Sequence, residues 1–132
     1  MSTPEDAFQA AYYYSCLYNS LALFAASPSY LHSLAGPVFD PVFELESEYE
    51  YAFNEPVFEA NFRHGKVSKA LRNDLLAFKS QVDAVPASLW RWESIVVHST
   101  WAAIRLAAEE LLVKLGESRR TYDADFTTII PA

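Results

Sequence analysis

The chain has 132 residues, of which 52% are hydrophobic, so we expect one domain with a real core and exclude a disordered chain. Its formal net charge of −7 argues against direct contact with nucleic acid or with an anionic membrane. A single cysteine, Cys16, excludes an internal disulfide, and the N-terminus lacks the basic segment of a secretory signal. We therefore expect a cytoplasmic protein with a single helical domain over residues 1–132.

Proline marks the expected start of five helices, because its missing N–H and fixed φ suit the first helical turn. The first helix follows Thr3-Pro4 and is expected to run to about Ala26. Residues 7–26 are as long as a membrane span, but they include four tyrosines and several amides and hydroxyls, and no basic residue flanks them. We expect this uncharged helix to lie in a soluble core or in an interface.

Three shorter helices are expected next, over residues 28–36, 41–53 and 56–64. The middle one is ambiguous, because four glutamates alternate with Leu, Ser and Tyr between Glu44 and Tyr51, and this period of two is typical of a strand. The same residues also carry an apolar stripe at helical spacing. The capping pair Asp40-Pro41 favours a helix, and a strand with one acidic face remains the alternative.

Two longer helices are expected in the second half of the chain, over residues 66–84 and 86–115. Both have apolar residues at steps of three and four, which predicts one buried face for each. In the last helix this stripe includes Trp92. We expect both Trp92 and Trp101 in the core, whereas Trp90 lies off the stripe and is expected to be exposed.

Together these elements predict an all-α fold. We expect a single-domain bundle of about six helices, followed by an extended or irregular tail from Thr121 to Ile130. The helix that starts at Pro86 is expected to be the central element of the core, because its apolar stripe is the longest.

No residue pattern in the sequence is typical of an active site or of a metal site. His32, His64 and His98 are isolated, and none has a second His or a Cys at the spacing of metal-binding helices. Cys16 lies in an apolar helix, where a buried and inert thiol is expected. The three glycines are isolated and form no phosphate-binding loop. We therefore expect no catalytic residue, no cofactor and no metal, and we expect that the chain is not an enzyme.

The acidic residues are concentrated in the first half of the chain. Residues 1–62 contain nine Asp and Glu and no Lys or Arg, whereas residues 63–132 contain eight acids and ten bases. A surface of this kind attracts basic proteins and speeds their association, although many charge runs are solvated faces without a partner. Tyrosines between the acids add contact area at low entropic cost. We expect a protein partner to be bound by Glu44, Glu46, Glu48, Tyr49, Glu50, Tyr51, Glu55 and Glu59.

Several short motifs after Ala70 carry a family resemblance that covers about half of the chain. They are Leu71-Arg-Asn-Asp-Leu-Leu, Val85-Pro-Ala-Ser-Leu-Trp-Arg-Trp-Glu, Trp101-Ala-Ala-Ile-Arg, Leu115-Gly116 and Arg120-Thr-Tyr122. With these motifs the chain resembles small helical immunity proteins of bacterial contact-dependent and polymorphic toxin systems. The resemblance implies a cytosolic inhibitor that binds its cognate toxin, and it fixes no functional residue. The acidic first half independently suits a basic toxin, such as a nuclease.

Three other functions remain open. A phage-type inhibitor can present its acids as a nucleic-acid mimic to a host defence nuclease. A small all-α ligand-binding module or enzyme would need a deep pocket, with Tyr12, Tyr13, Tyr14 and His98 as its expected lining. A structural subunit would hide its uncharged first helix in a homo-oligomer, which the sequence permits.

Overall fold

The computed structural model describes residues 4–37 and 39–122, with the backbone alone for residues 4–6. Within these residues the fold is all-α, as predicted, and the only strand-like pairing is one isolated bridge between Gly36 and Phe39. The elements are α1 (Pro4–Ala25), α2 (Pro28–Leu34), α3 (Pro41–Ala52), α4 (Glu55–Arg63), the 3-10 helix η1 (Lys69–Leu71), α5 (Arg72–Asp83), the 3-10 helix η2 (Ala87–Leu89), α6 (Trp92–Val97) and α7 (Ser99–Lys114).

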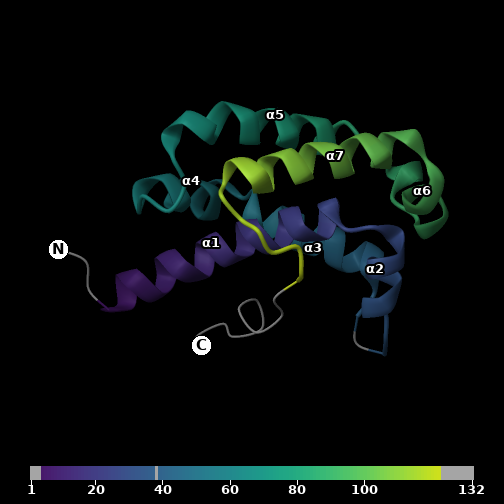
Figure 1. Ribbon diagram of the computed structural model, residues 1–132, viewed down its shortest axis with the longest axis horizontal. Coiled ribbons are helices and arrows are strands. Elements are labelled where there is room, and N and C mark those ends of the chain that lie inside the picture. The colour runs from purple at the N-terminus through teal and green to yellow at the C-terminus, as the bar shows by residue number, and fades with distance from the viewer. Residues whose placement is uncertain (1–3, 38, 123–132) are drawn as a thin grey trace.

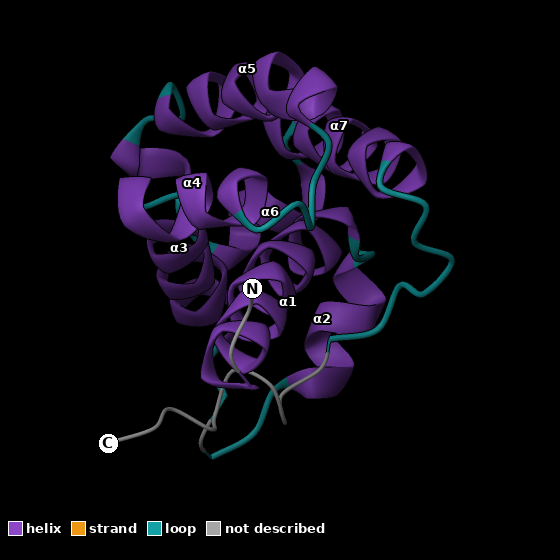
Figure 2. Cartoon of the chain, turned by 90° about the vertical axis from the view of Figure 1, so that its left-hand side faces the viewer, coloured by secondary structure: helices purple, strands orange, loops and turns teal. Residues whose placement is uncertain are grey.

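Helix α1 lies at the centre of the bundle, which corrects the expectation that the last helix takes this place. α3 and α4 cover one side of α1, α7 covers another, and α5 packs on the outside of α7 (Figures 1 and 2). Residues 15–24 of α1 are all buried, which a helix can tolerate only when it carries no charge on any face. Residues 15–24 of this uncharged helix therefore belong to the chain's own core, whereas residues 7–9 are exposed.

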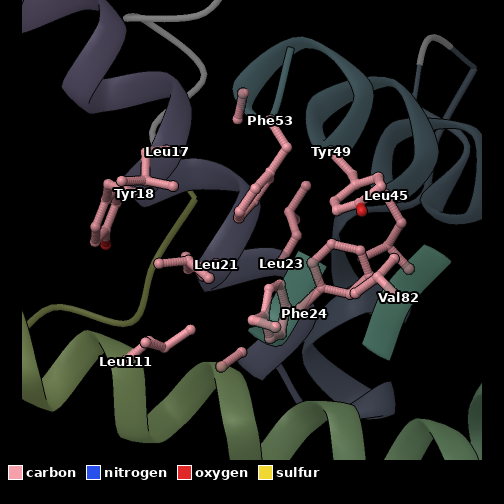
Figure 3. Packing of buried hydrophobic residues seen from close by; sticks show 14 of the residues in the cluster. Leu17, Tyr18, Leu21, Leu23, Phe24, Leu45, Tyr49, Phe53, Val82 and Leu111 are labelled. Carbon is pink, nitrogen blue, oxygen red and sulfur yellow. The ribbon is translucent and has the colours of Figure 1, made fainter. Parts of the chain in front are cut away.

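The core joins α1 to the helices on both of its sides. Figure 3 shows Leu21 and Phe24 of α1 near Leu111 of α7, with Tyr49 of α3 and Phe53, which directly follows α3, packed beyond them. The Phe24 ring is the hub of this cluster, with ring centroids 5.8 Å from Tyr49 and 6.3 Å from the buried Trp101. Burial of these large side chains is the main stabilising contribution to the fold.

The acidic segment is a helix and not a strand, as the Asp40-Pro41 pair favoured. The Asp40 side chain accepts hydrogen bonds from the backbone N–H groups of Val42 at 3.0 Å and Phe43 at 3.2 Å, and Pro41 occupies the first turn. These bonds satisfy two of the N–H groups that a helix start leaves without partners, and the carboxylate also suits the positive end of the helix dipole.

Replacing this cap should destabilise the protein measurably. We expect Asp40→Ala to lower the free energy of unfolding by about 1 kcal/mol in urea denaturation followed by circular dichroism. Asn54→Ala is the matched control, because Asn54 precedes α4 in the same way but its side chain makes no capping hydrogen bond. Equal losses in the two variants would contradict a stabilising role for the Asp40 cap.

The predicted helix over residues 86–115 is wrong as one element, because it is divided into η2, α6 and α7. Pro86 precedes only the three-residue η2, and the chain turns extended at Arg91 and again at His98, where ψ is 137°. At His98 the imidazole Nδ1 accepts the backbone N–H of Thr100 at 3.1 Å and thereby starts α7. A histidine cap carries none of the Pro or Gly signals from which the other boundaries were predicted.

This break also changes which tryptophan is buried. Trp101 is 2% exposed, as expected, but Trp92 at the start of α6 is only half-buried, with its ring 6.2 Å from that of His32. Trp90 is not exposed as predicted: its ring lies 4.8 Å from the Trp101 ring and packs against the core. The predicted stripe assumed one continuous helix, and the register is lost at Arg91.

Two further sequence expectations concern the fifth helix and α1. α5 begins at Arg72 rather than near Lys66, because residues 66 and 67 form a turn. The backbone N–H groups of these two residues both donate to the carbonyl of Asn61.

Across residues 4–37 and 39–122, no helix is both long enough and apolar enough to cross a membrane. In the tail, Thr121 and Tyr122 are irregular, as predicted, and the rest of the 121–130 prediction lies outside the described residues.

Candidate partner-binding surface

The eight residues predicted to bind a partner lie on α3 and on the first turns of α4, but they do not share one face. In an α-helix, residues two apart point in directions that differ by about 200°. The glutamates that a strand would place side by side are therefore split between different sides of α3.

Glu46, Glu50 and Glu55 are exposed, and we call them, together with the aromatic residue Phe43, the acidic surface. Phe43 is 63% exposed. Tyr51 is 42% exposed but lies on the side of α3 that carries Glu44 and Glu48, with its ring 6.2 Å from that of Tyr12 in α1. In the described part of the chain, none of the three carboxylates forms an ion pair. The acidic surface thus combines carboxylates that form no ion pair in the described chain with one accessible ring. Sequence reasoning missed Phe43, which an i to i+3 step from Glu46 on a helix would have found.

Tyr49 does not belong to this surface, although it was predicted to bind a partner. Its ring is 7% exposed, and its hydroxyl donates to the Asp83 Oδ1 atom at 2.5 Å and lies 3.0 Å from the Lys79 carbonyl of α5. Burial and the adjacent Asp83 carboxylate raise the pKa of this phenol well above its usual range. Tyr49 therefore joins α3 to α5 inside the fold, because it lies on the same helical stripe as Leu45 and Ala52.

Glu48 and Glu44 are half-buried on another side of α3. Burial raises the pKa of Glu48 to about 7, and the repulsion of Glu44 adds to this, against a hydrogen bond from the Tyr122 hydroxyl at 3.2 Å that lowers it. The pKa of Glu44 is also raised, by burial and by the Asp40 carboxylate. Glu48 is thus a half-buried carboxyl group without a cation beside it in the described chain, although it was predicted to bind a partner.

The raised pKa of Glu48 predicts how stability depends on pH. The folded state holds this proton more tightly than the unfolded state, whose pKa is near 4.5. The resulting stabilisation is complete below about pH 4.5 and is lost as pH rises through 7. We expect Glu48→Gln to remove this part of the pH dependence and to be more stable than the wild type at pH 8.

Urea unfolding at pH 5, 6, 7 and 8 measures the effect. Glu46→Gln is the control, because Glu46 is exposed on the same helix and makes no ion pair in the described chain. A Glu48→Gln variant that keeps the wild-type slope and is less stable at pH 8 would contradict the burial of an ionised Glu48.

Glu59 is partly neutralised and borders a groove. Its Oε1 atom lies 2.6 Å from Nη2 of Arg72, and this pair is exposed enough to add little stability. Between α3, α4 and α5 the groove has a volume of about 420 Å³. Its lining combines apolar and charged residues, which are Phe53, Glu55, Phe58, Glu59, Arg72, Leu76 and Lys79. Glu55 is the one charged residue of this lining that makes no ion pair in the described chain.

The histidines and the cysteine have structural positions. His98 caps α7, and His32 lies against Trp92. Burial raises the pKa of the Cys16 thiol to about 12, so it stays protonated and unreactive at neutral pH. Among the residues that the structure describes, no three His, Cys, Asp or Glu side chains lie close enough to hold a metal ion.

The residues predicted to line a ligand pocket are engaged within the fold. Tyr12 is buried, the Tyr14 hydroxyl donates to Glu117, and the His98 imidazole accepts the Thr100 N–H. Two hollows of the described chain, of about 190 and 420 Å³, have other linings, and neither includes Tyr12, Tyr13, Tyr14 or His98.

Comparison of the chain with protein-family models, with curated proteins and with solved structures returned no match. The resemblance to immunity proteins therefore rests on the sequence motifs alone and stays a prediction.

Proposed function

We propose that this chain is a small cytoplasmic inhibitor of the immunity type, which binds and neutralises a basic, nuclease-like toxin through the acidic surface. The observation that carries the proposal is the exposure of Glu46, Glu50 and Glu55, none of which forms an ion pair in the described chain. In contrast, Glu59 and all the acids of α5, α6 and α7 except Glu110 form ion pairs there.

An exposed ring, that of Phe43, supports this proposal. Binding energy at protein interfaces is concentrated in a few large side chains that are surrounded by polar groups. Phe43 precedes Glu46 by three residues and Glu50 by seven, so the three share one side of α3. An exposed Phe43 ring bordered by carboxylates suits a partner with an apolar pocket bordered by Lys or Arg, such as the substrate cleft of a nuclease.

The test is co-purification of a partner from the native host. The wild-type chain on a column should retain a basic protein, and the variant in which Glu46, Glu50 and Glu55 are replaced by Lys should not. The matched control replaces Asp74, Glu93 and Glu110 by Lys. It has the same net charge as the first variant, but its substitutions lie on α5, α6 and α7. Equal retention by both variants would place the binding site elsewhere.

The nucleic-acid-mimic alternative uses the same acidic surface and differs in its partner. A mimic should be displaced from its target by double-stranded nucleic acid, because both occupy one cleft, and its target should be a host defence nuclease. A toxin that the chain protects against in a viability assay supports the immunity function instead. The activity of the retained basic protein, either a toxin or a host defence nuclease, therefore distinguishes the two functions.

A further inference from the structure

The segment after α7, residues 117–122, crosses back over α1 and is called the strap here (Figure 1). Tyrosine hydroxyls hold it at three points. Tyr14 donates to the Glu117 carboxylate at 2.6 Å, Tyr18 donates to the Thr121 carbonyl at 2.6 Å, and the Tyr30 hydroxyl accepts the N–H of Tyr122 at 3.0 Å. The strap therefore lies along the α1 side of the bundle, held mainly by polar contacts.

The end of the strap contacts α3. The Tyr122 hydroxyl donates to Oε1 of Glu48, and the Tyr122 ring packs against Phe39 at 5.7 Å. Among the residues that the structure describes, the ionisable groups facing Glu48 are Tyr122 from the strap, Cys16 from α1 and Glu44 from α3 itself. None of these groups is a cation. The two arginines of the strap are engaged elsewhere, Arg119 over the Tyr18 ring and Arg120 with Glu109.

We propose that the strap is a pH-sensitive latch, which is closed while Glu48 is protonated and opens as Glu48 ionises. The geometry behind this is a carboxyl group that is half-buried beneath Tyr122 and has acids or neutral groups as its neighbours. Ionised Glu48 needs water, and lifting the strap supplies it, whereas the remainder of α3 stays packed on α1 through Leu45 and Tyr49.

The direction follows from linkage between the two states. In the closed state the pKa of Glu48 is about 7, and in an open state with a solvated carboxyl group it returns toward 4.5. The closed strap therefore binds the proton more tightly, and it loses stability relative to the open strap as pH rises. The Tyr122 hydrogen bond opposes this by favouring the ionised form, but it is the smaller influence. Opening uncovers Tyr14 and Tyr18 whatever partner α3 binds, so the latch does not depend on the proposed function.

Trypsin measures strap opening directly, because it cleaves after Arg119 and Arg120 once the strap has left α1. We expect the cleavage rate after Arg120, divided by the rate for a synthetic peptide of residues 114–126 at the same pH, to rise up to about tenfold between pH 6 and 8.5. Mass spectrometry of the same digests also gives the rate after Arg105, inside α7, which reports global unfolding.

Two variants decide the result. Glu48→Gln should show a normalised rate that is independent of pH, whereas Glu46→Gln should keep the wild-type rise; circular dichroism confirms that both are folded. A flat wild-type profile, or the same rise in Glu48→Gln, would overturn the latch. Cleavage after Arg120 that is no faster than cleavage after Arg105 would also overturn it, since the strap would then open only when the whole protein unfolds.

Discussion

Trp101→Ala should lower the free energy of unfolding by about 3–5 kcal/mol. The ring is 2% exposed and stacks on Phe24, and its Nε1–H donates to the carbonyl of Leu89 at 2.8 Å. Truncation leaves a cavity between α1 and α7 and leaves the Leu89 carbonyl without its donor. A loss of this size is a large part of the stability of a domain of this length.

Trp92→Ala is the matched comparison, because it removes the same side chain from a half-buried position on α6. We expect it to cost less than about 2 kcal/mol in the same urea titrations. If the order of the two losses is reversed, the break at Arg91 and His98 is misplaced and residues 86–115 form the single helix that the sequence pattern indicates.

The second large effect is on binding. Against the purified partner, replacing Glu46, Glu50 and Glu55 by Lys should weaken affinity at least about 100-fold, or roughly 3 kcal/mol. Bases on this surface would face the bases of the partner, and like charges across an interface are costly. The fold should be retained, because all three side chains are exposed and none forms an ion pair in the described chain.

The control for charge alone is the variant with Lys at positions 74, 93 and 110. It loses the exposed pairs of Asp74 with Lys114 and of Glu93 with Arg91, which contribute little to stability. Its affinity should fall by much less than that of the first variant. Phe43→Ala then separates the contribution of the exposed ring, with an expected loss of about 1–2 kcal/mol if the ring is an anchor.

Helix starts were predictable where a common capping residue directly precedes a proline, as at Ser27-Pro28 and Asp40-Pro41. Asp40 and Pro41 supply a cap and a fixed φ in consecutive residues, and this decided correctly between helix and strand for the acidic segment. At the start of α7 the imidazole nitrogen of His98 has the capping role that the Asp40 carboxylate has in α3, and imidazole is an uncommon acceptor at this position. The boundary there was missed because no common capping residue or proline marks it.

The members of the acidic surface were only partly predictable, for two physical reasons. On a strand, all four alternating glutamates would lie on one exposed face. On a helix, Glu48 points away from Glu46 and Glu50. Tyr49 and Glu48 also owe their burial to α5 and to the strap, which lie far away in sequence. Contacts of that kind depend on the tertiary packing, which periodicity does not specify.

The rate of association with the partner at two ionic strengths tests the central claim most directly. If the acidic surface meets a basic cleft, the association rate constant of the wild type and of the 74, 93 and 110 control should fall steeply between about 0.05 and 0.5 M salt. The variant with Lys at positions 46, 50 and 55 should associate slowly and lose that decrease. Identical rate constants and identical salt dependence for the wild type and this variant would contradict binding through the acidic surface.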